Sequence, residues 1–253
     1  SYGYGYVAYQ IAYLKANHPV EYLSALLTSV KSKLESAAVY LNECRLMGID
    51  VEVPDINRSE MDFTPVPNPD WDGGPYAEGS EQRGTTPGSI IFGMSAIRNV
   101  GEGIVEKILA ARHEGGPFES FIDFVERVEI EALNKRTIES LIKGGAFDCL
   151  GHPRKGLLQV YEQIIDLTVQ RRKEHDMGVM SLFGELDDGP SFDERPSIPD
   201  VEFEKMPRLA NEKEMLGLYI SDHPLLGFEA PVRRKADTGV AGLADTPAGA
   251  IVK

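Results

Sequence analysis

Gly101 and Gly103 stand one residue apart between two apolar stretches, and this spacing could serve phosphate binding. Glycine allows a tight turn to take left-handed backbone angles and lets the backbone come close to a ligand. The N–H groups that begin the following helix lie at its positive dipole end, so they would hold an anion without reading any base. The segment 97–108 therefore has the pattern of a helix-hairpin-helix motif. The candidate contacts are Arg98, Asn99, Val100, Gly101, Gly103 and Lys107.

Other interpretations of this turn remain open. A Gly-x-Gly between packed helices is also typical of an ordinary turn. A dinucleotide-binding loop fits less well, because no strand-to-helix unit surrounds the turn and the third glycine of that fingerprint is missing. Glu102 opposes a bound phosphate, although a carboxylate is favourable in the first turn of a helix.

A second segment, 134–147, strengthens the phosphate-binding hypothesis. Its pattern predicts a helix, a glycine pair and a further short helix, and two hairpins in tandem could grip two stretches of phosphate backbone. The candidate contacts are Lys135, Arg136, Lys143, Gly144 and Gly145. The basic residues among them, together with Arg154 and Lys155, supply local positive charge in an acidic chain. A solvated helix face would show the same composition.

One short apolar group interrupts the acidic, glycine-containing stretch after residue 174. It consists of Val179, Met180, Ser181, Leu182 and Phe183. Adjacent Leu and Phe in such a linker either pack back on their own domain or enter a pocket of a partner. Both alternatives remain open from the residues alone.

The sequence contains no pattern of a catalytic centre. Two-metal chemistry needs convergent carboxylates in an apolar setting, whereas Asp187-Asp188 lies in the linker. Cys44 and Cys149 lack partners at metal-ligand spacing and are expected to be reduced thiols. We therefore expect no catalytic residue, no metal ligand and no cofactor in this chain.

The composition sets limits on the class of protein. The chain has 253 residues, of which 42% are hydrophobic, and a net charge of −14, so any DNA contact must be local. No apolar run is long enough to span a bilayer and no signal peptide is evident, so we expect a cytoplasmic protein without membrane contacts. The chain begins at Ser1 without a methionine and ends in a strand-like Ile251-Val252-Lys253, so both ends are expected to be cuts.

The elements that must position these residues are mainly helical. Little polar face remains over residues 6–17, which predicts a helix buried on most sides. Further helices are expected after Pro19, over 34–47, in short units between 97 and 147, from Pro153 to about 173, and over 203–220. Two short strands are expected at 51–55 and 90–93, separated by a mobile loop at 65–89. The expected class is mainly α with a tandem helix-hairpin-helix, a two-stranded β element and extended linkers.

The chain resembles the alpha subunits of bacterial DNA polymerase III, the C-family replicative polymerases. The segments that carry the resemblance occur in the family's order: YQIAYLKANHPVEY at 9–22, CRLMG at 44–48, PDIN at 54–57, FGMSAI at 92–97, LNKR at 133–136, GGAFD at 144–148 and LGLYISDHP at 216–224. The order of so many short motifs is more specific than either hairpin alone.

The resemblance implies a division of the chain. It places the end of a fingers domain at 1–64, the loop or insertion at 65–89 and the tandem helix-hairpin-helix domain at 90–175. A linker at 176–201 would carry a peptide that binds the beta sliding clamp, with Leu182 and Phe183 as anchors and Val179 where the family usually has glutamine. A helix at 202–230 would precede an oligonucleotide-binding barrel, whose first strand would begin within 231–253.

The resemblance also implies partners. Duplex primer-template DNA, the sliding clamp and other replisome subunits are expected, in a nucleoid-associated bacterial replisome. The family extends DNA with deoxynucleoside triphosphates and magnesium ions held by palm carboxylates, which would lie upstream of this region, so whether the chain itself is an enzyme stays open. The alternatives are a DNA repair or nuclease subunit that uses the same hairpins, and a structural scaffold whose glycines form plain turns.

Overall fold

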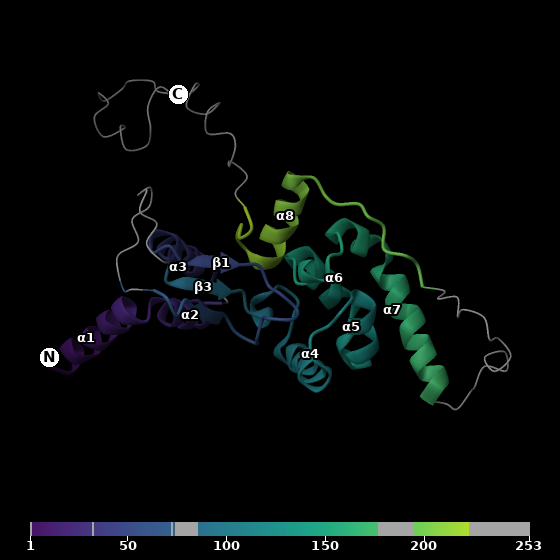
Figure 1. Cartoon of the computed structure of the whole chain (residues 1–253), viewed down its shortest axis with the longest axis horizontal. Coiled ribbons are helices and arrows are strands. Elements are labelled where there is room, and N and C mark those ends of the chain that lie inside the picture. The colour runs from purple at the N-terminus through teal and green to yellow at the C-terminus, as the bar shows by residue number, and fades with distance from the viewer. Residues whose placement is uncertain (1, 32, 72, 74–85, 177–194, 223–253) are drawn as a thin grey trace, which may run out of the picture.

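The computed structural model describes residues 2–31, 33–71, 73, 86–176 and 195–222, and helices dominate these residues (Figure 1). The elements, in chain order, are α1 (Tyr2–Asn17), α2 (Pro19–Ser29), α3 (Leu34–Leu46), β1 (Asp50–Glu52), β2 (Thr64–Pro67), β3 (Gly88–Ile91), the 3-10 turn η1 (Met94–Ala96), α4 (Glu102–Gly115), α5 (Phe121–Arg127), η2 (Ile130–Ala132), α6 (Lys135–Gly144), η3 (Asp148–Leu150), α7 (Arg154–Asp176) and α8 (Lys205–Leu216). The predicted class, mainly α with a small β element, is confirmed.

The sheet has one strand more than the sequence predicted. Its order is β1-β3-β2, with β1 parallel and β2 antiparallel to β3. The additional strand, β2, contains Pro65 and Pro67 and falls partly within the expected loop. Proline cannot donate a hydrogen bond to a neighbouring strand, so it is tolerated where β2 lies, at the edge of the sheet. The same prolines made this strand look like a loop in the sequence.

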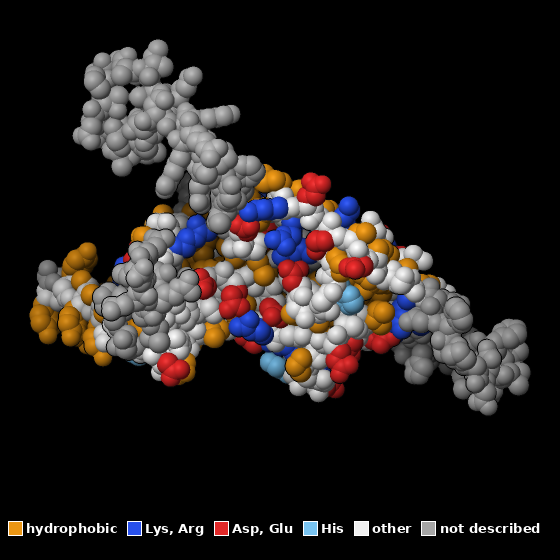
Figure 2. Space-filling view, turned by 45° about the horizontal axis from the view of Figure 1, so that its top comes forward, with side chains coloured by type: hydrophobic (Ala, Val, Ile, Leu, Met, Phe, Trp, Pro, Cys, Tyr) orange, Lys and Arg blue, Asp and Glu red, His pale blue; other side chains and the backbone are white. Residues whose placement is uncertain are grey.

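Helix α1 differs most from expectation. The sequence predicted a helix buried on most sides, yet none of its residues is buried. Tyr2 and Tyr4 are 91% and 80% exposed. The helix extends away from the other elements (Figure 1), and hydrophobic side chains gather at this end of the surface (Figure 2). An apolar composition makes a helix suited to burial, but it does not supply a covering surface, and the described residues provide none.

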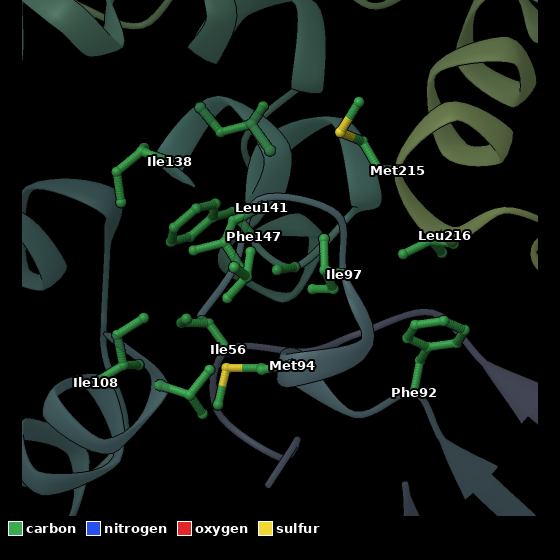
Figure 3. Close-up of a cluster of buried hydrophobic side chains, with 14 of the residues drawn as sticks. Ile56, Phe92, Met94, Ile97, Ile108, Ile138, Leu141, Phe147, Met215 and Leu216 are labelled. Carbon is green, nitrogen blue, oxygen red and sulfur yellow. The ribbon is translucent and has the colours of Figure 1, made fainter. Parts of the chain in front are cut away.

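A single hydrophobic core joins the sheet region to the later helices. Figure 3 shows Ile56, which follows β1, beside Met94 and Ile97 around the first hairpin, with Leu141 and Phe147 from the α6 region close by. Arg112 of α4 strengthens this junction, since its buried guanidinium donates to the carbonyls of Ile56 and Ser59. The expected boundary at residue 90 therefore falls inside β3 and inside a shared core.

The last described helix, α8, packs across α6 (Figure 1). It ends at Gly217, whose φ of 80° is the left-handed angle that commonly terminates helices. Along the described parts of the chain, no helix combines the length and the apolar character needed to cross a membrane.

Candidate nucleic-acid interface

The first hairpin is the turn between η1 and α4, residues 97–101. The side chains of Ile97 and Val100 are buried in the core, and they anchor the turn to it. Asn99 takes a left-handed φ of 64°, which Asn adopts more readily than most non-glycine residues. The turn therefore reverses at Asn99 and not at a glycine.

The reversed turn is held by α6. The side-chain amide of Asn99 donates to Ser140 Oγ at 3.0 Å, and Thr137 Oγ1 donates to the Asn99 carbonyl at 3.0 Å. These two bonds fix the turn against a helix that lies some forty residues later in the chain. The role of Asn99 in this structure is to hold the hairpin in shape, whereas the sequence nominated it as a contact residue.

The N-terminus of α4 is open toward solvent. Gly101 is its N-cap residue, and no side chain caps the helix. Among the described residues, the backbone N–H groups of Glu102 and Gly103 have no hydrogen-bond partner. An added Cβ at Gly101 or Gly103 would meet no heavy atom within 4 Å. The first turn of α4 therefore offers unsatisfied N–H donors, at the positive end of a helix dipole, with room for a ligand.

A second chain reversal, which the sequence analysis missed, enters α6. It runs from α5 through η2 to Asn134, the N-cap residue of α6. Asn134 Oδ1 accepts hydrogen bonds from the N–H groups of Arg136 at 2.9 Å and Thr137 at 3.4 Å. An Asn directly before an apolar-periodic helix is a known start signal, and that signal was available at this position. Like α4, α6 follows a 3-10 turn, but its N-terminus is already capped.

The glycine pair that the sequence assigned to the second hairpin lies elsewhere. Gly144 and Gly145 are buried at the C-terminus of α6. Gly145 has a φ of 92°, and a Cβ there would lie 2.3 Å from Nη2 of Arg154. Gly144 faces Leu216 of α8. These two glycines end a helix beneath other side chains, so the structure shows no open surface at the position that the sequence analysis predicted for a phosphate contact. Val100 is likewise buried and offers no side-chain contact at the surface.

The nominated cations fall into two groups. Three of them already form ion pairs: Lys107 with Glu129 at 2.6 Å and Glu131 at 3.3 Å, Lys135 with Asp166 at 2.8 Å and Glu162 at 3.4 Å, and Lys143 with Glu139 at 2.7 Å. Arg98 and Arg136 are exposed and have no acidic partner in the part of the chain that the structure describes. Figure 2 shows basic and acidic side chains interspersed on one face. Arg98 and Arg136 are therefore the cations best placed for a phosphate.

Arg154, counted in the sequence as local positive charge, is buried. Its guanidinium donates to Asp148 and to the carbonyl of Lys143, and its Nη1 lies 3.7 Å from Oε2 of the fully buried Glu212. Glu212 in turn accepts bonds from the N–H groups of Ile220 and Ser221. The buried pair of Arg154 and Glu212 fixes α8 on the hairpin region, while Asp148 lies at the exposed edge of the cluster.

Both cysteines are free thiols. Burial raises the pKa of Cys44 to about 12, and partial burial together with the neighbouring Asp55 raises the pKa of Cys149 to about 12. Within the described ranges, no group of three or more His, Cys, Asp or Glu side chains could hold a metal ion. The apolar peptide at Val179–Phe183 lies outside the described residues.

The sequence of this region matches a known class of module. The sequence model of the helix-hairpin-helix motif matches residues 48–157, a range that contains the sheet, both chain reversals and the first turn of α7. The chain is 42% identical over 248 residues to the DNA polymerase III subunit alpha of Mycobacterium tuberculosis, 44% identical over 246 residues to that of Saccharopolyspora erythraea, and 36% identical over 270 residues to that of Pseudomonas aeruginosa.

These alignments cover 96%, 95% and 98% of the chain. Over almost its whole length, the chain is therefore similar to DNA polymerase III alpha subunits. It spans 19% to 21% of the length of these relatives.

Proposed function

We propose that the first hairpin and α4 bind the phosphate backbone of duplex DNA without reading its sequence. The observation that carries this proposal is the uncapped N-terminus of α4, where the free N–H groups of Glu102 and Gly103 lie between two glycines with open space around them. Main-chain donors at a helix N-terminus favour an anion by geometry and by dipole. Because they contact phosphate and sugar only, they fix position on the duplex but carry no sequence information.

The second chain reversal would contact the backbone differently. Asn134 occupies two N–H groups of α6, so the contact falls to side chains of its first turn. That turn holds Lys135 and Arg136 and no acid. Cations there oppose the helix dipole, and a bound phosphate would offset this unfavourable interaction. The two reversals, joined through the contacts of Asn99 with Thr137 and Ser140, would then act as one rigid grip.

The setting of this module is proposed from its relatives. We propose that it belongs to a replicative polymerase whose other regions extend the primer with deoxynucleoside triphosphates and magnesium, and that its own contribution is to hold the duplex product. The names of the relatives and the match to a helix-hairpin-helix family support this setting. It is consistent with an acidic chain, since a backbone grip needs a local site rather than a positive surface.

The experiment compares two Gly-x-Gly pairs in the full 253-residue chain. The test variant carries Gly101→Val and Gly103→Val, and the matched control carries Gly3→Val and Gly5→Val in α1, where the glycines have equally open space. Duplex affinity is measured by fluorescence anisotropy at several salt concentrations. We expect the test pair to weaken binding by about tenfold and the control pair to leave it unchanged, with binding that falls steeply as salt rises. Equal affinities for both variants would reject the hairpin as the DNA site and favour a scaffold role.

A second proposal concerns the peptide Val179–Phe183. We propose that Leu182 and Phe183 anchor the chain to a sliding clamp, which would convert DNA rebinding into an intramolecular event. Support comes from the position of this apolar pair in an acidic linker and from the family of the relatives. Leu182→Ala with Phe183→Ala should abolish retention on an immobilised clamp, with Val179→Gln expected to increase it. Retention of the double variant would refute the anchor.

A further inference from the structure

Lys31, which follows α2, connects the two arms of the first hairpin although it lies far from them in the sequence. Its ammonium donates to Ser95 Oγ in η1 at 3.0 Å and to Glu102 Oε1 in α4 at 3.0 Å. A third bond reaches Asp62 Oδ1 at 2.9 Å. A lysine ammonium has three N–H donors, so all of them are engaged. The contact thus spans the turn at 97–101 from one arm to the other.

The partner of this lysine is the acid nearest to the proposed phosphate site. Glu102 is the first residue of α4, and its own N–H is one of the two free donors there. A free carboxylate at this place would repel a phosphate, because like charges at short range repel each other even in water. Lys31 shares its single positive charge between Glu102 and Asp62, so the ion pair offsets part of the charge of Glu102 and holds its side chain in place. The hydrogen bond to Asp62 raises the pKa of Lys31, so the ammonium stays charged at neutral pH.

We propose that Lys31 is a positioning residue for DNA binding, which acts by holding Glu102 in an ion pair beside the open N-terminus of α4. This inference rests on the proposed function of the hairpin. It explains how an acid can occupy the first turn of a phosphate-binding helix, because the carboxylate already forms an ion pair with Lys31 before DNA binds. Lys31 itself need not touch the DNA, since its effect passes through Glu102.

A double-mutant cycle in the full chain tests the coupling. Lys31→Met frees the Glu102 carboxylate, and we expect it to weaken duplex binding by about fivefold at about 100 mM salt. In the Glu102→Gln background the same change should weaken binding by less than about twofold, because little charge remains to be released. Lys31→Arg should restore most of the affinity, since it keeps the positive charge. A role that is only structural would give the same loss in both backgrounds.

Two further variants separate the alternatives. Asp62→Asn removes the other acidic partner but leaves the contact of Lys31 with Glu102, so affinity should change by less than about twofold. Glu102→Gln alone should raise affinity, but by less than about twofold, because Lys31 already offsets part of its charge. A gain of about fivefold would show that Lys31 does not offset the acid and would overturn the proposal, even if Lys31→Met failed to fold.

These experiments distinguish a failure of the proposed role of Lys31 from a failure of the proposed DNA site at the hairpin. If the wild-type chain binds duplex and the Gly101 and Gly103 variant does not, but Lys31→Met has equal effects with and without Glu102, the positioning role is wrong while the DNA site stands. If the wild-type chain fails to bind duplex DNA, both proposals are overturned.

Discussion

Helices α4 and α6 both follow a 3-10 turn and a chain reversal, yet their N-termini are satisfied in opposite ways. α4 begins at Gly101 without a side-chain cap and carries the acid Glu102 in its first turn. α6 begins at Asn134, which caps two N–H groups, and carries Lys135 and Arg136. The first helix therefore presents main-chain donors and the second presents charged side chains. The comparison teaches that one module can offer a phosphate two chemically different contacts.

The two glycine pairs also differ, because their surroundings differ. Gly101 and Gly103 face open space, whereas Gly144 and Gly145 are enclosed by Arg154 and Leu216. In the proposed function, glycine allows a ligand to approach at the first pair, whereas at the second pair it ends a helix. Substitutions should therefore affect binding at one pair and stability at the other.

The largest expected effect is on stability, at Gly145. Gly145→Ala places a Cβ against the Arg154 guanidinium and forces a left-handed angle, so we expect the free energy of unfolding to fall by about 2–3 kcal/mol. Urea unfolding of the full chain measures this value. Duplex affinity at a temperature where the variant is folded should be unchanged. A stable variant with weakened DNA binding would reverse the assignment of the two pairs.

The next effect separates the two cations of α6. Arg136→Gln should lower duplex affinity by about fivefold to tenfold and reduce the salt slope by about one, because this side chain is free to pair with a phosphate. Lys135→Gln is the matched control, and we expect a loss below about twofold, since Asp166 and Glu162 already engage that ammonium. Salt-dependent anisotropy titrations give both values. Equal losses would mean that the ion pairs of Lys135 open on binding.

A smaller effect should follow from removing the cap of α6. Asn134→Ala loses the bonds to the N–H groups of Arg136 and Thr137 and should lower stability by about 1 kcal/mol. If α6 binds DNA through side chains, affinity should stay constant once the fraction folded is taken into account. A clear gain in affinity would instead indicate that uncapped N–H groups can bind phosphate at α6 as well.

The smallest expected effect is at α4, where one substitution should raise stability and weaken DNA binding. Gly103→Ala should raise stability by about 0.5 kcal/mol, since alanine favours a helix over glycine and the site has room for a methyl group. The same methyl group should weaken duplex binding by about threefold, because it stands where a phosphate approaches. Thermal unfolding and anisotropy together test this opposition. Parallel changes in both quantities would contradict the open-site assignment.

The sequence predicted the helical class and the first hairpin because both depend on local patterns. Gly101 and Gly103 mark the hairpin directly, and apolar periodicity marks the helices around it. The second reversal was not predicted because the glycine pair at 144–145 is a stronger local turn signal than the single Asn134. A glycine pair after a helix has the same sequence whether it binds a ligand or ends the helix, so only burial distinguishes the two.

Long-range contacts account for the other differences. Lys135 pairs with Asp166, which lies 31 positions later in the chain, and Lys31 pairs with Glu102, which lies 71 positions later. Sequence periodicity cannot reveal pairs this far apart. The buried state of Arg154 depends on Asp148 and Glu212, which come from a separate turn and a separate helix. Helix α1 shows the reverse case, because its composition predicted burial while its exposure depends on what surrounds it.

The backbone N–H groups of α4 and α6 provide the most direct test of the central claim. In a 15N-labelled chain, titration with a duplex of about 20 base pairs should shift the amide resonances of Glu102 and Gly103 strongly, as expected for donors that gain a phosphate. The amide of Thr137, already bonded to Asn134, should move little. Large shifts at Thr137 with Glu102 and Gly103 unmoved would contradict the account.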